Sequence, residues 1–218
     1  MKRVVGGLLL LLMVLLVSCG GNHTSHRSSG DGEMLGPVDT TRTDERKPVS
    51  DFKSVAVYDA SVVDIRLCAD SAYSVKVNGS KTYVEAQEAE VKGEEMILRF
   101  ASSVASKRKT HVMITAPTLE GIKVVNCGKL MVGGNLLACS NFVLDLEKVN
   151  VAQINPLMKA SYVEAHLAHV MFAEFRTMCD ALLLTTKSVG HVKVFGHAKK
   201  RKIEADAMNC LDLNGLEK

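Results

Sequence analysis

FVLDLEKVNVAQINPLMKASYVEAHLAHVMFAEFRTMCDALLLTTKSVGHVKVFGHAKKRKIEADAMNCLDL, residues 142–213, consists of short apolar segments that return at a nearly constant spacing. A sequence period near 20 with two short strands per unit is typical of repeat proteins whose units bury apolar side chains only by stacking on their neighbours. The pattern therefore predicts a right-handed parallel β-solenoid, whereas longer and irregularly spaced strands would favour a sandwich. The first segments start at Phe142, Tyr162, Leu182 and Ile203, so that each start follows the previous one by about one period. The second segments start at Leu130, Val149, Val170, Val192 and Leu211, with the same approximate spacing.

Residues 51–116, which precede the repeats, alternate apolar and polar side chains with the two-residue period of a strand. Asn78-Gly79-Ser80 and Lys92-Gly93-Glu94 have the residue types of hairpin turns. We expect an antiparallel or mixed β region here, which caps the repeats of residues 117–218 and makes the head (residues 51–218) all-β. The candidate strands are Phe52–Tyr58, Val62–Cys68, Tyr73–Asn78, Tyr83–Gln87, Met96–Phe100 and His111–Ala116.

Residues 1–18 resemble a bacterial lipoprotein signal peptide. Two basic residues precede the apolar run Val4–Val17, which is too short for a comfortable bilayer span, and Leu16-Val17-Ser18-Cys19 matches a lipobox. We expect cleavage after Ser18 and lipidation of Cys19, whose acyl chains would hold the protein at a membrane. An uncleaved signal anchor is the alternative. Residues 19–50 are polar and rich in Gly, Ser and Thr, which predicts a flexible tether after the lipidated cysteine.

The composition excludes several classes of protein. Of 218 residues, 47% are hydrophobic and only one apolar run is long and uninterrupted, so the chain is not a polytopic membrane protein. Removal of residues 1–18 removes two basic and no acidic residues, which lowers the net charge from +3 to +1. Trp is absent and aromatic residues are 5%, so neither a nucleic-acid partner nor an aromatic sugar cleft is indicated.

The remaining cysteines give no sign of a metal or redox site. None of them forms a C-x-x-C arrangement, which argues against a zinc ribbon and a thioredoxin-like motif. An odd number outside the cytosol leaves at least one thiol unpaired, and we favour buried structural thiols over disulfides. These cysteines are Cys68, Cys127, Cys139, Cys179 and Cys210.

Other polar clusters are weak candidates for chemistry. His166 and His169 would need a turn between them to share a metal ion, because residues three apart in a strand point to opposite faces. Lys199–Lys202 is a basic run that we interpret as a solvated loop, with contact to an anionic glycan or lipid headgroup as the alternative. Asp145, Glu164, Glu174 and Asp180 fall in different repeats without the pairing that a glycosidase needs, and His191 and His197 follow glycines. We therefore expect no enzyme, no cofactor and no metal site.

The ordered motifs of this chain resemble the DUF2807 family, the auto-transporter adhesin head GIN domain. The resemblance rests on a lipobox and polar tether, then DFKSVAVYDASVVDIRL, YSVKVNG, MILRF and HVMITAPTLEGIKVVNCG, followed by β-repeats of about twenty residues. It covers residues 51–218, and its most specific stretch is Ala116-Pro117-x-Leu119-x-x-Ile122-x-Val124. Asn126-Cys127-Gly128 stands where the family commonly has a small Gly/Ser-rich triplet. The family implies no catalytic residues.

Two functions fit these features. The first is a lipid-anchored binding head for a glycan or an envelope partner, because long solenoid faces suit extended partners. The second is a structural or assembly lipoprotein that pairs through the open C-terminal end of the repeats, with weak self-association there, because Asn214–Lys218 is too short to fold back over a repeat. No acid-rich run follows Cys19, so we expect the outer membrane, with its periplasmic face favoured over the cell surface.

Overall fold

The computed structural model describes residues 42–100, 110–206 and 208–217, in which the protein is all-β apart from one short helix, α1 (Lys81–Glu85). The predicted all-β class is confirmed. The strands are β1 (Arg42–Lys47), β2 (Ser54–Tyr58), β3 (Val62–Leu67), β4 (Ser74–Ser80), β5 (Gln87–Lys92), β6 (Glu95–Phe100), β7 (His111–Ala116), β8 (Gly121–Gly134), β9 (Leu137–Ala168), β10 (Phe172–Lys187), β11 (Val189–Ala205), β12 (Met208–Asp212) and β13 (Leu216–Glu217).

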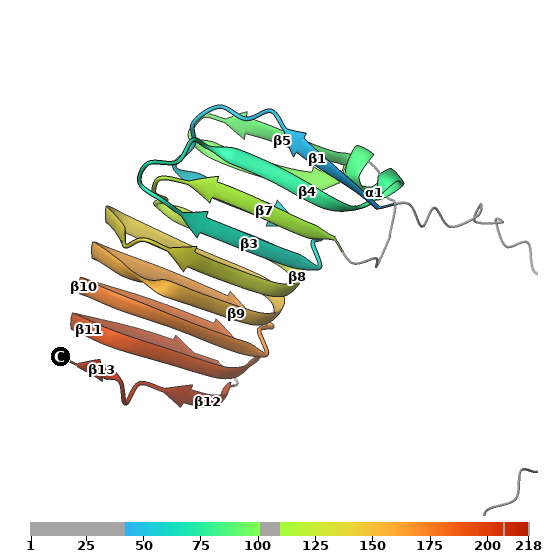
Figure 1. Cartoon of the computed structure of the whole chain (residues 1–218). Helices are drawn as coiled ribbons and strands as arrows, with labels where there is room; N and C mark the ends of the chain where they lie inside the picture. The colour runs from blue at the N-terminus through green and yellow to red at the C-terminus, as the bar shows by residue number, and fades with distance from the viewer. Residues whose placement is uncertain (1–41, 101–109, 207, 218) are drawn as a thin grey trace, which may run out of the picture. The chain divides into compact units, whose positions relative to one another are not determined.

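These strands form one large sheet that is not closed into a barrel, and β8 joins its two halves (Figure 1). The first part of β8 pairs in parallel with β2, and the second part pairs in parallel with β3. β2 also pairs in parallel with β6, and β3 also pairs in parallel with β7. Residues 51–116 therefore do more than cap the repeats, because β2, β3, β6 and β7 continue the same parallel pairing. The outer strands β1, β4 and β5 pair antiparallel, so this half is mixed β, as expected.

The long strands β8 to β11 pair in parallel with partners about one repeat away in sequence. Ala152 in β9 pairs with Leu130 in β8 on one side and with Ala173 in β10 on the other. Ala173 pairs in turn with Val192 in β11. The interval between partners in β9 and β10 shortens by two residues between Phe175 and Arg176, where the β9 strand accommodates two extra residues.

One column of residues with left-handed backbone marks a corner of the stack. Positive φ angles of 51–58° occur at Asp59, Asn126, Lys148, His169 and Ser188, and the pairings on either side place these five residues next to one another in successive strands. Asn126 Nδ2 donates to Asp59 Oδ1 over 2.6 Å, which fits the preference of Asn and Asp for this conformation. At Asn126 and Lys148 the backbone turns within a strand, so short segments of the sequence merge into long strands such as the 32 residues of β9, whereas β2, β9 and β10 end at the other three corner residues.

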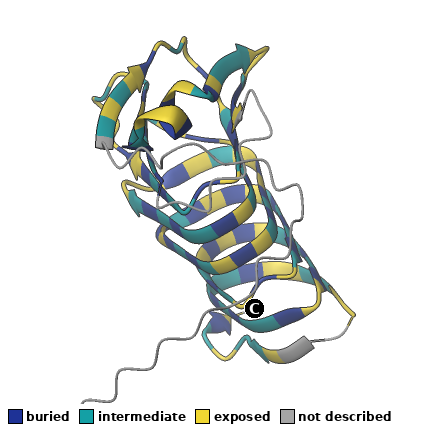
Figure 2. Cartoon of the chain, turned by 90° about the vertical axis from the view of Figure 1, so that its right-hand side faces the viewer, coloured by how far each residue is buried: buried dark blue, intermediate teal, exposed yellow. Residues whose placement is uncertain are grey.

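The core lies between the stacked strands, and Figure 2 shows buried and exposed residues alternating along them. Phe142 and Phe175 are fully buried, and so are Ile154 and Val194, which pair with Phe175. This burial of aliphatic side chains is the main stabilising contribution, at roughly 25 cal/mol per Å² of apolar surface removed from water.

Two predictions for the N-terminal half are wrong. Tyr83–Gln87 is not a strand: Lys81–Glu85 forms α1, in which the adjacent residues Tyr83 and Val84 are both buried. Over five residues, an alternating and a helical apolar pattern cannot be told apart. Asn78-Gly79-Ser80 is not a hairpin turn but the end of β4, which pairs with β1, a strand formed inside the segment expected to be tether. The Lys92-Gly93-Glu94 turn does join β5 and β6, with Gly93 at φ 63°.

Three predictions for the repeats also need correction. The aligned columns are partly out of register: Leu182 pairs with Val163 rather than Tyr162, and with Arg201 rather than Ile203. Lys199–Lys202 is not a loop but part of β11, paired in parallel with β10. Asn214–Lys218 is not too short to fold back, because β13 pairs with β11 and Leu216 is only 5% exposed.

None of the helices in the described residues has the length and apolar character needed to cross a bilayer. The expected signal peptide and Cys19 lie outside the described residues.

Candidate binding groove

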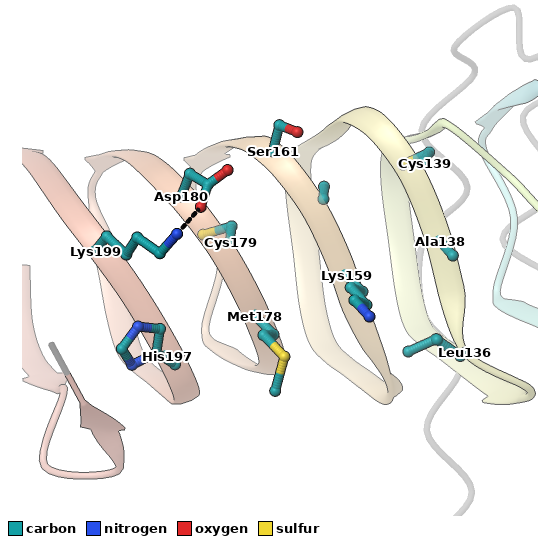
Figure 3. Close-up of a pocket in the computed structure, with 11 residues that line it drawn as sticks. Leu136, Ala138, Cys139, Lys159, Ser161, Met178, Cys179, Asp180, His197 and Lys199 are labelled. Carbon is teal, nitrogen blue, oxygen red and sulfur yellow. Dashed lines mark ion pairs between the residues drawn. The ribbon is translucent and has the colours of Figure 1, made fainter.

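An open groove of about 590 Å³ runs across β9, β10 and β11 (Figure 3). Its position follows from the strand alternation, which turns every second side chain outward, and from the parallel register, which stacks those side chains in rows. Lys159, Met178 and His197 form one such row across three paired strands. Ser161, Asp180 and Lys199 line the other side of the groove, and Leu136 lies at its end.

Between the two sides of the groove lies a buried row of small residues. Ala160, Cys179 and Ala198 are direct neighbours in the parallel register, at 9%, 4% and 0% exposure. Strands lie about 4.8 Å apart, so these three-residue rows extend for roughly 10 Å across β9, β10 and β11. The site therefore suits an extended ligand that lies across the strands.

The surface of the groove combines apolar and cationic groups. Leu136 and Met178 are 46% and 45% exposed, which is unusual for large apolar side chains in this protein. Asp180 Oδ1 and Lys199 Nζ form an ion pair at 2.6 Å. This ion pair lowers the pKa of the Asp180 carboxyl and raises the pKa of the Lys199 ammonium. No ion pair of Lys159 occurs among the described residues, so its charge remains available to a ligand.

The two thiols in the groove are poor nucleophiles. Burial raises the pKa of both Cys139 and Cys179, with smaller contributions from Glu120 and Asp180 respectively. The thiolate is the reactive form, so a raised pKa keeps both groups protonated and unreactive at neutral pH. The groove can bind a ligand, but it holds no activated nucleophile.

A second cavity of about 380 Å³ lies where β2, β8 and β9 adjoin. Its charges are mostly paired: Lys53 contacts Glu94 at 2.6 Å and Lys123 contacts Asp145 at 2.6 Å. These pairs raise the pKa of both lysines, which hold their protons at neutral pH. With most of its charges already paired, this cavity is a weaker candidate than the groove.

The histidines and carboxylates considered from sequence do not converge. His166 contacts Glu164 at 2.8 Å, whereas His169 is an exposed corner residue with φ 55°. His191 stacks on Phe172 with ring centroids 5.7 Å apart. Of the set, His197 and Asp180 share the groove. Among the described residues, no group of three or more His, Cys, Asp or Glu side chains is arranged to hold a metal ion.

The cysteines divide into buried and exposed groups. Cys127 and Cys179 are buried, Cys139 is partly buried, and Cys68 and Cys210 are exposed; all five are free thiols. Gly128, next to Cys127, has a structural reason to stay small, because a Cβ there would lie 2.7 Å from the Ser61 carbonyl oxygen. The triplet at residues 126–128 is thus a tightly packed corner.

Sequence reasoning missed the groove. Its lining residues carry no motif, and they become neighbours only through a register that the sequence places one or more residues off. One usable signal was present: Ala160, Cys179 and Ala198 are small residues that recur at a constant interval, matching the repeat.

Comparisons with known proteins give one family and several similar folds. The family model described as "Putative auto-transporter adhesin, head GIN domain" (DUF2807) matches residues 51–216. No curated protein matches the chain. A structure described as a putative adhesin from Parabacteroides distasonis ATCC 8503 is 16% identical, with a TM-score of 0.65, and the match covers 82% of this chain and 75% of that chain. A structure described as a putative lipid binding protein from the same organism is 13% identical, with a TM-score of 0.60, covering 79% and 76%. At these identities the likeness shows the fold alone.

Proposed function

The chain belongs to the DUF2807 family, and we propose that it is a lipid-anchored protein of the cell envelope whose head binds a ligand without catalysis. The adhesin-like character of the family supports an envelope or surface protein. The lipobox ending in Cys19 supports attachment through acyl chains. The groove across β9, β10 and β11 is the observation that carries the binding role.

The parallel part of the head is, in this proposal, a right-handed β-solenoid with rungs of about twenty residues. Three features support it: parallel partners about one sequence repeat apart, left-handed corner residues that recur at a similar interval, and core residues on the inner side of each strand. Units that stack in this way present long, flat sides on which an extended ligand can lie.

The chemistry of the groove narrows the ligand class. Leu136 and Met178 offer apolar surface, and Lys159 offers a positive charge without an internal partner among the described residues. The lining includes no Phe, Tyr or Trp ring on which a neutral sugar could stack. We therefore infer an extended anionic ligand, either an acidic glycan or the acyl and headgroup portion of a lipid. The similar structure described as a putative lipid binding protein supports testing a lipid as the ligand.

The protonation states of the groove side chains agree with a head that binds without catalysis. Lys199 keeps Asp180 ionised, and burial keeps the thiols of Cys139 and Cys179 protonated, so none of the three is poised for proton transfer or nucleophilic attack at neutral pH.

The anchor is tested by Cys19→Ala. We expect the variant to leave the membrane fraction after a carbonate wash, and retention of the variant would contradict lipid anchoring. Protease treatment of intact cells then reports the face of the outer membrane. We propose the periplasmic face, which predicts full protection of the head until the cells are lysed.

Binding at the groove is tested with Met178→Glu, which places a negative charge on its apolar surface and repels an anionic ligand. Met171→Glu is the matched control, because Met171 is also an exposed methionine, at 66%, but does not line the groove. Purified protein is titrated with acidic polysaccharides in one arm and with fatty acids in the other. Loss of binding with Met178→Glu alone supports the groove. Equal binding by both variants would exclude it.

The second candidate function is envelope assembly through the C-terminal end of the stack. It is favoured by the short strands β12 and β13, which cover only part of β11. In this role the protein pairs with another chain, or weakly with itself, and needs no soluble ligand.

A further inference from the structure

The last long strand, β11, has a covered half and an uncovered half. On its outer side, β12 pairs with residues between Val189 and Lys193, and β13 pairs with Gly196 and His197. From residue 198 to residue 205, β11 pairs with β10 on its inner side, and no described strand pairs with its outer side. Figure 1 shows β12 and β13 as short, separate arrows beside the longer β11. The uncovered half is thus a sheet edge with backbone groups available for pairing.

The charges on this uncovered edge are only partly balanced within the chain. Lys199 pairs with Asp180 at 2.6 Å, and Lys202 pairs with Glu204 at 2.7 Å. Lys200 and Arg201 have no ion pair among the described residues, and Lys200 is exposed. Two adjacent positive charges therefore remain on one sheet edge.

Arg201 occupies a position that is apolar in the preceding strands. It pairs with Leu182, which pairs with Val163, and both of these residues are buried. Arg201 is itself half-buried, and its Nε is enclosed without a hydrogen-bond partner among the described residues. A buried N–H that lacks a partner is unfavourable, and a guanidinium is best satisfied by a carboxylate. The next layer of the stack would have to supply that carboxylate.

A second copy of this chain is an unfavourable partner for the uncovered edge of β11. If two such edges paired antiparallel about Arg201, the two Arg201 side chains would face each other and each Lys200 would face a Lys202. Like charges directly opposite in adjacent strands are destabilising. The same basic residues protect the edge against indiscriminate pairing, so the edge selects for a strand of opposite charge.

We propose that the edge of β11 from residue 198 to residue 205 binds an acidic, extended segment of a partner protein by strand addition. In the added strand, acidic residues lie opposite Lys200, Arg201 and Lys202, and an apolar residue lies opposite Ile203. Backbone pairing continues the sheet, and the carboxylate opposite Arg201 accepts from the enclosed Nε. The proposal rests on the second candidate function and adds the chemistry of the partner.

The test uses the full-length chain in detergent and short fluorescein-labelled peptides, with binding followed by fluorescence anisotropy. The first peptide carries three consecutive acidic residues followed by Val-Thr-Val. The second has the three acids replaced by their amides. The third keeps the acids but has proline in place of the threonine, which removes a backbone donor and disfavours the sheet. We expect the first peptide to bind at least about tenfold more tightly than either control, equivalent to roughly 1.4 kcal/mol.

Two charge reversals locate the binding site. Lys200→Glu should weaken binding of the acidic peptide by about tenfold or more, whereas Lys187→Glu, an equal change of charge at an exposed residue of β10, should change it less than about twofold. Thermal unfolding of both variants checks that the fold is retained. Met178→Glu, the groove variant, should bind the peptide normally, so failure of the groove proposal and failure of this one are distinguishable.

Several results would overturn the proposal. Equal binding of the proline peptide would show simple charge attraction rather than strand addition. Light scattering that finds a stable dimer, to which the acidic peptide does not bind, would assign the edge to a second copy. Binding that appears only after residues 20–41 are removed would assign it to the chain's own N-terminal segment.

Discussion

Gly196→Ala is expected to be among the most damaging single-methyl additions in this protein. Gly196 lies in β11 with φ +108°, and a Cβ there would be 2.0 Å from the Thr177 carbonyl oxygen of β10. Its N–H also donates to the carbonyl oxygen of Gly215 over 2.8 Å, which helps hold β13 against β11. Backbone strain and a backbone clash thus act at one residue, beside the C-terminal strands.

The two contributions can be estimated separately. A side chain at positive φ costs about 1–2 kcal/mol. An added carbon that forces packed backbone apart costs about 1–3 kcal/mol more. Thr177 is fully buried, so its strand has little room to move. We expect Gly196→Ala to lower the free energy of unfolding by about 2–5 kcal/mol, a large part of the roughly 5–15 kcal/mol that domains possess.

Three other glycines serve as matched controls in urea unfolding of the chain from Gly20 onward, followed by far-UV circular dichroism. Gly93 has φ +63° and no atom within 4 Å of a Cβ, so Gly93→Ala isolates the strain. Gly128 has ordinary φ but a 2.7 Å contact with the Ser61 carbonyl oxygen, so Gly128→Ala isolates the clash. Gly133 has neither feature, and Gly133→Ala should cause no loss. If Gly196→Ala were as stable as Gly133→Ala, both the register of β10 with β11 and this reasoning would be refuted.

Further predictions concern the corner column, the core and pH. Lys148→Gly should stabilise the protein by about 0.5–1 kcal/mol, because Lys148 has a left-handed backbone with φ 53° that glycine adopts without strain. Lys187→Gly in β10 should destabilise the protein by a similar amount. The urea midpoint should therefore rise for the first variant and fall for the second. Phe175→Ala should cost about 3–5 kcal/mol and Phe172→Ala clearly less, since only Phe175 is fully buried; equal losses in thermal unfolding would contradict the core assignment. Burial raises the pKa of Cys127 from 9.0 to about 11, so the thiol ionises at lower pH in the unfolded chain than in the folded protein. The free energy of unfolding should therefore be at its full value below pH 9 and fall by on the order of 2–3 kcal/mol towards pH 11. In urea titrations, Cys127→Ala should lack this decline.

The local pattern of the sequence was sufficient for the all-β class, the family and most strands. Alternation of apolar residues is a property of neighbouring positions, so β3 and β7 appear at Val62–Leu67 and His111–Ala116, close to where they were expected. The repeat near twenty residues was visible for the same reason. The proposed lipid anchor also rests on a local pattern, since the lipobox-like motif is contiguous and ends at Cys19.

The exact pairing was decided by tertiary structure, because it depends on contacts between residues far apart in sequence. Ser54 pairs with Gly121 and Val62 with Lys129, and no local pattern specifies partners so distant along the chain. A two-residue irregularity in β9 shifts its later register with β10, which is why Leu182 lies beside Val163. The groove and the uncovered edge of β11 exist only in that register: side chains become neighbours across a sheet when backbone hydrogen bonds align them, and one residue of slip would turn each to the opposite face.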